Sequence, residues 1–281
     1  MKKYLSLIKF SHTVFALPFA MIGFFLAVWQ EGYAFSWKTF LLMLACMVCA
    51  RSAAMGFNRV ADSKFDRENP RTANREIPSG VIAKNSAIIF VIACCAGFMV
   101  SAFFINRLCF FLSPVALAVV LGYSYTKRFT HLSHFFLGLG LALAPVGAYL
   151  AVTGKFHMLP VLLGLAVLFW VSGFDIIYAL QDEEFDREQK LFSIPVWLGK
   201  KNALLFSSII HLLCIACLVS VGFIGAFHIW YWMGLLIFLL LLIYQHTLVK
   251  PNDLSKVNLA FATTNGIASI VFSVFVLIDF F

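Results

Sequence analysis

The sequence predicts an all-α, polytopic membrane protein with nine transmembrane helices around a central cavity, built from two pseudo-repeated halves. First, 62% of the 281 residues are hydrophobic and only 12% are charged, whereas about a quarter of the residues of a soluble domain are charged. Second, apolar runs long enough to cross a hydrocarbon core recur along the whole chain. Third, one polar motif occurs twice at a constant spacing, which indicates an internal duplication.

The nine predicted spans are separated by short polar turns or by two long polar loops. Gly and Pro occur inside several spans, which membrane helices tolerate. No convincing cleavage site follows the basic N-terminus, so we expect residues 1–281 to form one mature membrane domain. The spans cover residues 11–29, 38–60, 84–105, 108–126, 133–152, 157–180, 202–224, 227–248 and 257–279.

The distribution of Lys and Arg predicts the orientation. The net charge of +8 is explained by the excess of basic residues in cytoplasmic loops, and we expect no nucleic-acid partner. With nine spans and a cytoplasmic N-terminus, the C-terminus lies outside a bacterial-type inner (plasma) membrane. Only Lys38, Arg107 and Lys155 then face outward, and Arg51 and Arg59 lie within the second span. The sixteen cytoplasmic residues are Lys2, Lys3, Lys9, Lys64, Arg67, Arg71, Arg75, Lys84, Lys127, Arg128, Arg187, Lys190, Lys200, Lys201, Lys250 and Lys256.

Two acidic motifs, "NRVADSKFD" and "YALQDEEFD", open the two long cytoplasmic loops, 58–83 and 178–201. Each motif ends a predicted span, and each of its spaced positions has a counterpart 120 residues away. If the helices continue, residues four apart line one face. We therefore expect the two motifs to face each other across a cavity. The spaced residues are Asn58, Asp62 and Asp66 in the first motif and Tyr178, Asp182 and Asp186 in the second.

Four carboxylates facing one another would repel unless something positive lies between them. Mg²⁺ prefers oxygen ligands and is typically held by one or two carboxylates together with substrate phosphates. The stretch after the first motif supplies Arg71 and Arg75, whose spacing of four suits the binding of one anion. Lys127 and Arg128 form a second basic pair. The alternative is a pair of solvated loops of mixed charge, which two matching motifs at helix ends disfavour.

Three stretches, "NRVADSKFD", "NPRTANREIPSG" and "YALQDEEFD", resemble the UbiA family of intramembrane aromatic prenyltransferases. The resemblance covers essentially the whole chain and is nearest to members that prenylate 4-hydroxybenzoate. The stretches "SHTVFALPFAMIG" and "DREQKLFSIPVWLG" also resemble a branch that includes menaquinone-pathway members acting on naphthoates. The resemblance therefore predicts the reaction and leaves the aromatic acceptor open.

The resemblance implies a role for each motif residue. A polyprenyl diphosphate places its tail among apolar helices, and its diphosphate bridges Mg²⁺ ions. The metal ligands are expected to be Asn58, Asp62, Asp66, Asp182 and Asp186, and the four aspartates are the expected catalytic residues. Arg71, Arg75 and Lys127 are expected to bind the diphosphate as it leaves.

An aromatic acid needs a cation for its carboxylate, and Arg51 is the candidate. It precedes Asn58 by seven residues, about two helical turns, and the resemblance implies a substrate-binding Arg there. An Arg that extends its side chain to the interface is the alternative. Tyr178 is expected to bind the aromatic substrate, where it steadies the cationic intermediate through its ring face or donates a hydrogen bond to the diphosphate. Anchoring at the membrane interface is the alternative for this residue. Asp175, one turn earlier, is left outside the predicted core site. Besides the substrates and the lipid bilayer, the sequence predicts no partner.

Two alternatives remain open at this stage. Within the enzyme class, the acceptor is a dihydroxynaphthoate of menaquinone biosynthesis instead of the 4-hydroxybenzoate of ubiquinone-type biosynthesis. In another class, the chain is a secondary transporter, since transporters also combine internal repeats with charged residues at a cavity. The charges lie at one membrane face and not at the midplane, which favours the enzyme.

Overall fold

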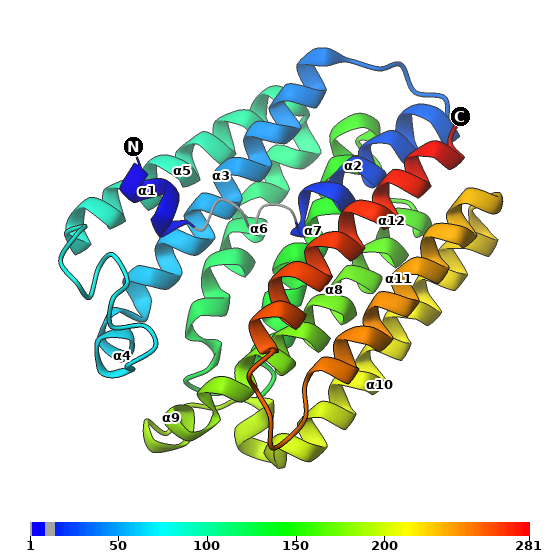
Figure 1. Ribbon diagram of the computed structural model, residues 1–281. Helices are drawn as coiled ribbons and strands as arrows, with labels where there is room; N and C mark the ends of the chain where they lie inside the picture. The colour runs from blue at the N-terminus through cyan, green and yellow to red at the C-terminus, as the bar shows by residue number, and fades with distance from the viewer. Residues whose placement is uncertain (1, 9–14) are drawn as a thin grey trace.

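The computed structural model describes residues 2–8 and 15–281, and within them it is helical with no strand. Figure 1 shows long helices running side by side, with short helices at one end. The helices are α1 (Lys2–Leu7), α2 (Leu17–Phe25) with a π-helical continuation (Leu26–Gln30), α3 (Trp37–Ala61), α4 (Ser63–Glu68), α5 (Lys84–Ile105), α6 (Arg107–Thr126), α7 (Ser133–Thr153), α8 (Met158–Ala179), a 3₁₀ turn (Leu180–Asp182), α9 (Glu183–Glu188), α10 (Ile194–Ile224), α11 (Ile229–Leu248), a π-helical segment (Leu259–Thr264) and α12 (Asn265–Asp279).

The fold class is confirmed, and the number of full-length spans differs slightly from nine. In the described part of the chain, eight helices are long and apolar enough to cross a membrane. The ninth apolar helix, Leu17–Gln30, is shorter. Its 14 residues reach about 21 Å, less than a hydrocarbon core of about 30 Å. Residues 11–14, where we predicted this span to begin, lie outside the described residues, as does Lys9.

Local sequence explains where several helices begin and end. Ser36 and Asn106 cap α3 and α6, accepting hydrogen bonds from the backbone N–H groups of Thr39 (3.3 Å) and Cys109 (2.8 Å). At the C-terminus of α4, Asn69 takes an extended conformation (φ −88°, ψ 118°) because it precedes Pro70, which disfavours the helical region.

Helix α10 begins eight residues earlier than predicted. Ser193 caps it, and a helical turn follows before Gly199 interrupts the helix with φ 74° and ψ 161°. A left-handed φ is available to glycine without steric cost. The predicted start at 202 therefore corresponds to the segment after the kink, and the first turn packs beside the second motif loop.

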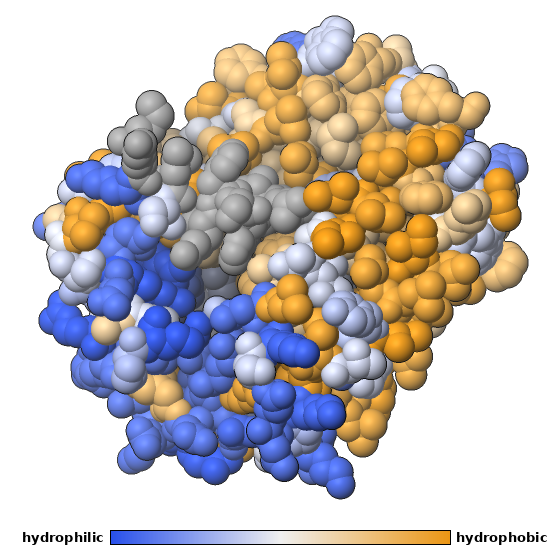
Figure 2. All heavy atoms as spheres, in the orientation of Figure 1, coloured by the Kyte–Doolittle hydropathy of each residue, from blue (hydrophilic) through white to orange (hydrophobic). Residues whose placement is uncertain are grey.

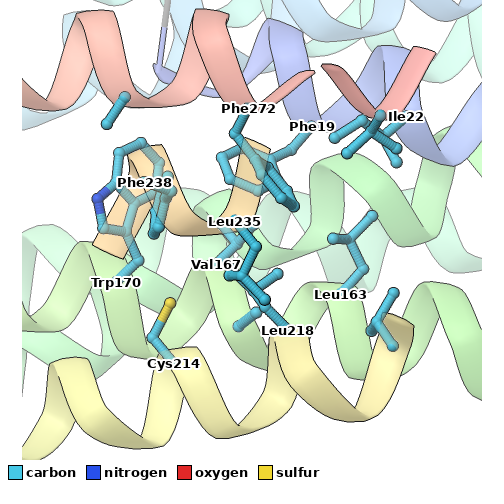
Figure 3. Close-up of a cluster of buried hydrophobic side chains, with 14 of the residues drawn as sticks. Phe19, Ile22, Leu163, Val167, Trp170, Cys214, Leu218, Leu235, Phe238 and Phe272 are labelled. Carbon is cyan, nitrogen blue, oxygen red and sulfur yellow. The ribbon is translucent and has the colours of Figure 1, made fainter. Parts of the chain in front are cut away.

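The largest apolar core joins α2, α7, α8, α10, α11 and α12. Figure 3 shows aromatic side chains from α2, α8, α11 and α12 within one apolar cluster. The Trp170 ring centroid lies 5.2 Å from that of Phe19 and 5.8 Å from that of Phe238. Its Nε1–H donates to Asn265 Oδ1 at 3.0 Å, so the one polar group of this buried side chain has a hydrogen-bond partner. The packing fixes α8, which carries the second motif.

Small residues allow close helix contacts in the half of the bundle around α7. A Cβ added at Gly23 of α2 would lie 2.1 Å from the carbonyl oxygen of Pro145 in α7. A Cβ added at Gly138 of α7 would lie 2.5 Å from the carbonyl oxygen of Leu168 in α8. Such contacts permit the backbone approach on which membrane helix packing depends.

Polar residues gather at one end of the bundle. Figure 1 shows α4 and α9 at this end and the C-terminus at the opposite one. Figure 2 shows hydrophilic atoms around α4 and α9 and hydrophobic atoms over the long helices. Helix α1 packs near the first motif loop, since the Ser6 hydroxyl donates to Glu76 and Leu7 clusters with Ile77 and Ile82. The protein is an integral membrane protein whose two motif loops share one end.

Candidate active site

The two motifs share one backbone conformation. Helix α3 ends at Ala61, and Asp62 lies between α3 and α4 with φ −92° and ψ 5°. Asp182 lies at the matching break before α9 with φ −104° and ψ 3°. The spacing of four predicts one face of an unbroken helix, whereas each helix is interrupted at the middle aspartate of its motif. The repeated break supports the pseudo-duplication read from the 120-residue offset.

Despite the break, Asn58, Asp62 and Asp66 still follow one another at helical spacing. The backbone N–H of Asp62 still donates to the Asn58 carbonyl at 2.9 Å, and that of Asp66 to the Asp62 carbonyl at 2.8 Å. The side chains follow this order, because Asn58 Nδ2 donates to Asp62 Oδ2 at 2.8 Å. The amide oxygen of Asn58 is thus the atom left to bind a cation.

Both motifs line one cavity of about 300 Å³ at the polar end of the bundle. The structure brings every predicted site residue to it. These residues come from the C-terminal half of α3, from α4 and the loop after it, from the residue that follows α6, from the end of α8, and from the 3₁₀ turn and α9 that follow α8. The predicted residues that line it are Arg51, Asn58, Asp62, Asp66, Arg71, Arg75, Lys127, Tyr178, Asp182 and Asp186.

Each of the four motif aspartates is paired with a different basic side chain. In the first motif, Asp66 Oδ1 accepts from Arg75 Nη1 at 2.6 Å, and Asp62 Oδ1 lies 3.6 Å from Arg128 Nη2. In the second, Asp186 Oδ2 accepts from Lys127 Nζ at 3.0 Å, and Asp182 binds Arg71. The pairing brings the predicted metal ligands and the predicted diphosphate ligands together in one polar cluster.

Arg71 joins the two halves of the molecule. It donates to Asp182 through Nε at 2.9 Å and also through Nη2. Its Nη1 donates to the hydroxyl of Tyr178 at 2.9 Å. Asn69 supports the same contact, because its side chain donates to Asp182 Oδ1 at 3.3 Å and accepts from the backbone N–H of Arg71 at 2.9 Å. A bidentate Arg–carboxylate pair is geometrically specific, so it ties the first loop to the second motif.

The electrostatics of the cluster favour additional positive charge. Burial, reinforced by the negative charge of Asp66, raises the pKa of Asp62 to about 6, against the opposing effect of Lys127 and Arg128. Burial also disfavours the charge on Lys127, but Asp186 and Asp182 outweigh it and raise the lysine pKa. One oxygen of Asp66, Oδ2, is buried and has no hydrogen-bond partner among the described residues.

These residues fit a hard divalent cation that is completed by a substrate. The available donors are oxygens of Asn58 and the motif aspartates, which suit Mg²⁺, and the unpartnered Asp66 Oδ2 is an open ligand position. Within the described residues, no three His, Cys, Asp or Glu side chains form a ready-made metal site. The site therefore resembles those in which one or two carboxylates and substrate phosphates hold Mg²⁺ together.

A second, mainly apolar cavity of about 310 Å³ adjoins the first. The two share Arg51, Met55, Tyr123, Leu137 and Leu141 in their walls. The rest of its lining comes from α3, α5, α6 and α7, together with Ala16 and Phe156. Arg51 thus lies where a polar chamber meets an apolar one. Its Nε is buried and has no hydrogen-bond partner in the described part of the chain.

Tyr178 lines the cavity, but its ring and its hydroxyl both already contact other side chains. Its ring contacts Phe261, with 4.2 Å between centroids, and the Arg71 guanidinium lies 5.3 Å from its centroid. The hydroxyl is held by Arg71. The ring therefore lines the cavity while the hydroxyl belongs to the Arg71–Asp182 contact.

Sequence reasoning missed several residues of the site. Asn69 was overlooked, although its place before Pro70 and Arg71 in the quoted "NPRT" stretch was a usable signal. Arg59, adjacent to Asn58, lines the cavity with a buried Nε that has no partner among the residues described. Asp175 also lines the cavity, bound to His134 at 2.7 Å. That contact crosses two helices, and no sequence spacing indicates it.

Comparisons with known proteins all point to one family. The model of the UbiA prenyltransferase family matches residues 16–270. A 4-hydroxybenzoate octaprenyltransferase of Nitrosomonas eutropha is 30% identical over 80% of this chain and 79% of its own length, and one of Coxiella burnetii is 28% identical over 97% and 94%.

Solved structures show the same architecture. The apo structure of a UbiA homolog from Aeropyrum pernix matches with a TM-score of 0.87 and 32% identity, covering 96% of this chain and 98% of that one. A UbiA homolog from Archaeoglobus fulgidus bound to DMAPP and Mg²⁺ matches with a TM-score of 0.74 and 19% identity over 99% of both chains, a likeness in fold. With a family match that spans most of the sequence, the chain belongs to the UbiA prenyltransferase family.

Proposed function

We propose that this protein transfers a polyprenyl group from a polyprenyl diphosphate to the ring of an aromatic acid, 4-hydroxybenzoate, in ubiquinone-type quinone biosynthesis. The observation that carries the proposal is the polar cluster itself. Two acidic motifs and their four basic partners line one cavity, and an apolar cavity adjoins it. A diphosphate with a long hydrocarbon tail combines the same two chemistries in one molecule.

The proposed metal is Mg²⁺, with Asn58, Asp62 and Asp66 on one side of the cavity and Asp182 and Asp186 on the other as its ligands. The buried Asp66 Oδ2 supports this assignment because an unpartnered carboxylate oxygen is costly without a cation. When bound, the metal supplies positive charge that stabilises the diphosphate as the allylic C–O bond breaks. The Archaeoglobus structure holds Mg²⁺ in the same fold.

Arg71, Arg75 and Lys127 are the proposed diphosphate ligands. Each pairs with a motif aspartate, so the side chains proposed for the diphosphate lie directly beside those proposed for the metal. Substrate entry with its metal would exchange these partners: the aspartates take the metal and the basic side chains take the phosphate oxygens. Positive groups placed around a leaving group stabilise the charge that develops on it.

The acceptor is proposed to bind at the boundary between the two cavities. Arg51 holds the carboxylate of the aromatic acid, and its buried, unpartnered Nε supports this role. Tyr178 lies between the Arg71–Asp182 contact and the cavity, where its ring face can steady a developing allyl cation. The ring carbon ortho to the phenolic oxygen then attacks C1 of the prenyl group.

The second candidate acceptor is a naphthoate. A dihydroxynaphthoate of menaquinone biosynthesis offers the same carboxylate to Arg51 and an equally electron-rich ring. The names of the relatives favour the hydroxybenzoate. Membership of a prenyltransferase family decides against the secondary transporter.

The proposed setting is the bacterial inner membrane, with the N-terminus and motif loops cytoplasmic and the C-terminus outside. The bias of Lys and Arg supports this orientation, and α1 shares one end of the bundle with the first motif loop. Because the site draws on both halves of the chain, we propose that residues 1–281 act as one domain.

The test is a transfer assay with membranes that contain the protein, a radiolabelled polyprenyl diphosphate and Mg²⁺. 4-Hydroxybenzoate and a dihydroxynaphthoate are supplied in separate reactions, each with an EDTA control. The proposal predicts metal-dependent label in prenylated 4-hydroxybenzoate. Label in the naphthoate alone would reassign the acceptor, and transfer to neither from folded protein would overturn the proposal.

A further inference from the structure

A fifth carboxylate, Asp175, lines the same cavity as the motif aspartates. It lies on α8, one turn before Tyr178, and its side chain is 20% exposed. The four motif aspartates each pair with Lys or Arg, whereas the partner of Asp175 among the described residues is a histidine. His134 Nδ1 lies 2.7 Å from Asp175 Oδ2, and the mechanism proposed so far gives neither residue a role.

The hydrogen bonds around His134 fix how it holds Asp175. Its side chain is fully buried, and its Nε2 lies 3.4 Å from the backbone N–H of Ile194, which donates to it. An imidazole nitrogen that accepts a hydrogen bond carries no proton, so this network assigns the proton to Nδ1. Nδ1–H therefore donates to Asp175 Oδ2, which leaves Oδ1 available to the cavity.

The packing of α7 against α8 makes this contact rigid. Gly138, one turn after His134, lies so close to α8 that an added Cβ would be 2.5 Å from Leu168 O and 2.6 Å from Ser172 Oγ. The Ser172 hydroxyl also lies 3.2 Å from the His134 carbonyl oxygen. A carboxylate oriented by a buried histidine on packed helices is a preorganised group.

The depth of Asp175 matches the size of an aromatic acid held by Arg51. Asp175 precedes Asp182 by seven residues, the last three of which form the 3₁₀ turn, and Arg51 precedes Asp62 by eleven, which correspond to about 12 Å and about 16 Å along the helices. Asp62 and Asp182 mark equivalent helix breaks. Arg51 thus lies about 4 Å deeper than Asp175, comparable to the distance from the carboxylate of 4-hydroxybenzoate to the ring carbon next to its hydroxyl. A ring whose carboxylate binds Arg51 would present its reacting edge at the level of Asp175.

We propose that Asp175 is the base that takes the ring proton in the transfer reaction, with His134 as its positioning residue. The inference rests on the proposed function. As the prenyl C–O bond breaks, its electron pair leaves with diphosphate, and a ring π pair forms the new C–C bond. The attacked carbon still carries its hydrogen. Asp175 Oδ1 accepts that proton, the C–H electron pair restores the aromatic ring, and the neutral acid later loses the proton to water.

The experiment compares wild-type protein with Asp175→Asn and Asp175→Ala, using acceptor with hydrogen or deuterium at the ring positions ortho to the hydroxyl. Asp253→Asn is the matched control, since Asp253 lies in the exposed loop between α11 and α12. Folding is checked by the melting temperature in detergent. Metal-dependent binding of the prenyl diphosphate is measured separately from turnover.

Asp175→Asn is expected to lower kcat by about 10²–10⁴-fold while prenyl diphosphate binding stays at the wild-type level. A primary deuterium isotope effect, absent in wild type, should appear because proton loss has become rate-limiting. Added formate should raise the rate of Asp175→Ala by replacing the missing carboxylate, which also serves if the Asn variant does not fold. A merely structural role would produce neither the isotope effect nor the rescue.

Two results would overturn the assignment of Asp175 while the proposed function stands: transfer by a folded variant at the wild-type rate, or a lowered rate with neither an isotope effect nor rescue by formate. Absence of transfer by wild-type protein is a different result. It would overturn the proposed function, and the assignment of Asp175 with it.

Discussion

Arg71 binds both carboxylate oxygens of Asp182, a residue 111 positions later in the chain. This contact joins the loop after the first motif to the second motif, and Asn69 and Tyr178 complete it. The contact explains how two motifs on separate helices form one site. In the proposed function, Asp182 exchanges this basic partner for metal when substrate binds.

Arg71→Ala should therefore separate two kinds of binding. Loss of a charged hydrogen-bond donor is expected to weaken prenyl diphosphate binding by about 10- to 100-fold. Mg²⁺ alone should bind more tightly, because Asp182 has lost its competing cation. Both affinities can be measured by isothermal titration calorimetry on protein in nanodiscs. Arg67→Ala is the control, since Arg67 is exposed at the end of α4, and equal behaviour of the two variants would contradict the exchange.

Metal and diphosphate should stabilise the protein together and not separately. Mg²⁺ alone must displace basic side chains that already neutralise the aspartates, so it is expected to raise the melting temperature little. Mg²⁺ with an unreactive prenyl diphosphate analogue should raise it more than the two separate shifts combined, since the displaced side chains gain a new anion. Additive shifts would indicate independent binding. EDTA should abolish both the joint shift and prenyl transfer.

Arg51→Ala should affect the aromatic acceptor selectively. If Arg51 holds the acceptor carboxylate, its removal is expected to raise the acceptor KM by about 10- to 100-fold and to leave prenyl diphosphate affinity unchanged. Arg51→Lys should recover part of the loss, because Lys keeps the charge without the paired donors. Steady-state kinetics with each substrate varied in turn measure the split. An unchanged acceptor KM would remove Arg51 from the acceptor site.

The apolar cavity can be tested by filling it. Gly147 of α7 lines it, and an added Cβ at this position would meet nothing within 4 Å. Gly147→Phe is expected to lower transfer from long prenyl donors more than from short ones, since the bulky ring occupies the space of the tail. Gly122→Phe is the matched control, because Gly122 has equally open surroundings on an exposed helix face. Transfer rates with donors of graded length measure the effect. Equal rates at all lengths would place the tail elsewhere.

Most of the architecture can be predicted from the sequence because the length and apolar composition of each membrane-spanning helix are visible in its own residues. The predicted ends of most spans lie within one or two residues of the observed helices, as at 84–105 and 133–152. Two boundaries failed for physical reasons. The first helix is shorter over the residues described, and Gly199 allows α10 to begin before its kink. Capping and kinks depend on single residues that hydropathy does not register.

The candidate site was predicted as a set of residues and not as a set of contacts. Spacing placed Asp62 and Asp66 on one face, and the offset of 120 placed Asp182 and Asp186 opposite them. Which base pairs with which acid depends on how α4, α6 and α8 pack. For the same reason, nothing in the sequence linked Asp175 to His134, which lies 41 residues earlier on another helix.

The central claim is that both motifs together bind the metal and the diphosphate. Its most direct test is the Mg²⁺-dependent binding of an unreactive prenyl thiolodiphosphate to wild-type protein and to Asp62→Asn and Asp182→Asn, with Asp253→Asn as control. Both motif variants are expected to fold but to lose metal-dependent binding, while the control binds as wild type does. If either folded motif variant keeps the wild-type affinity, that motif is not part of the metal–diphosphate site and the account is wrong.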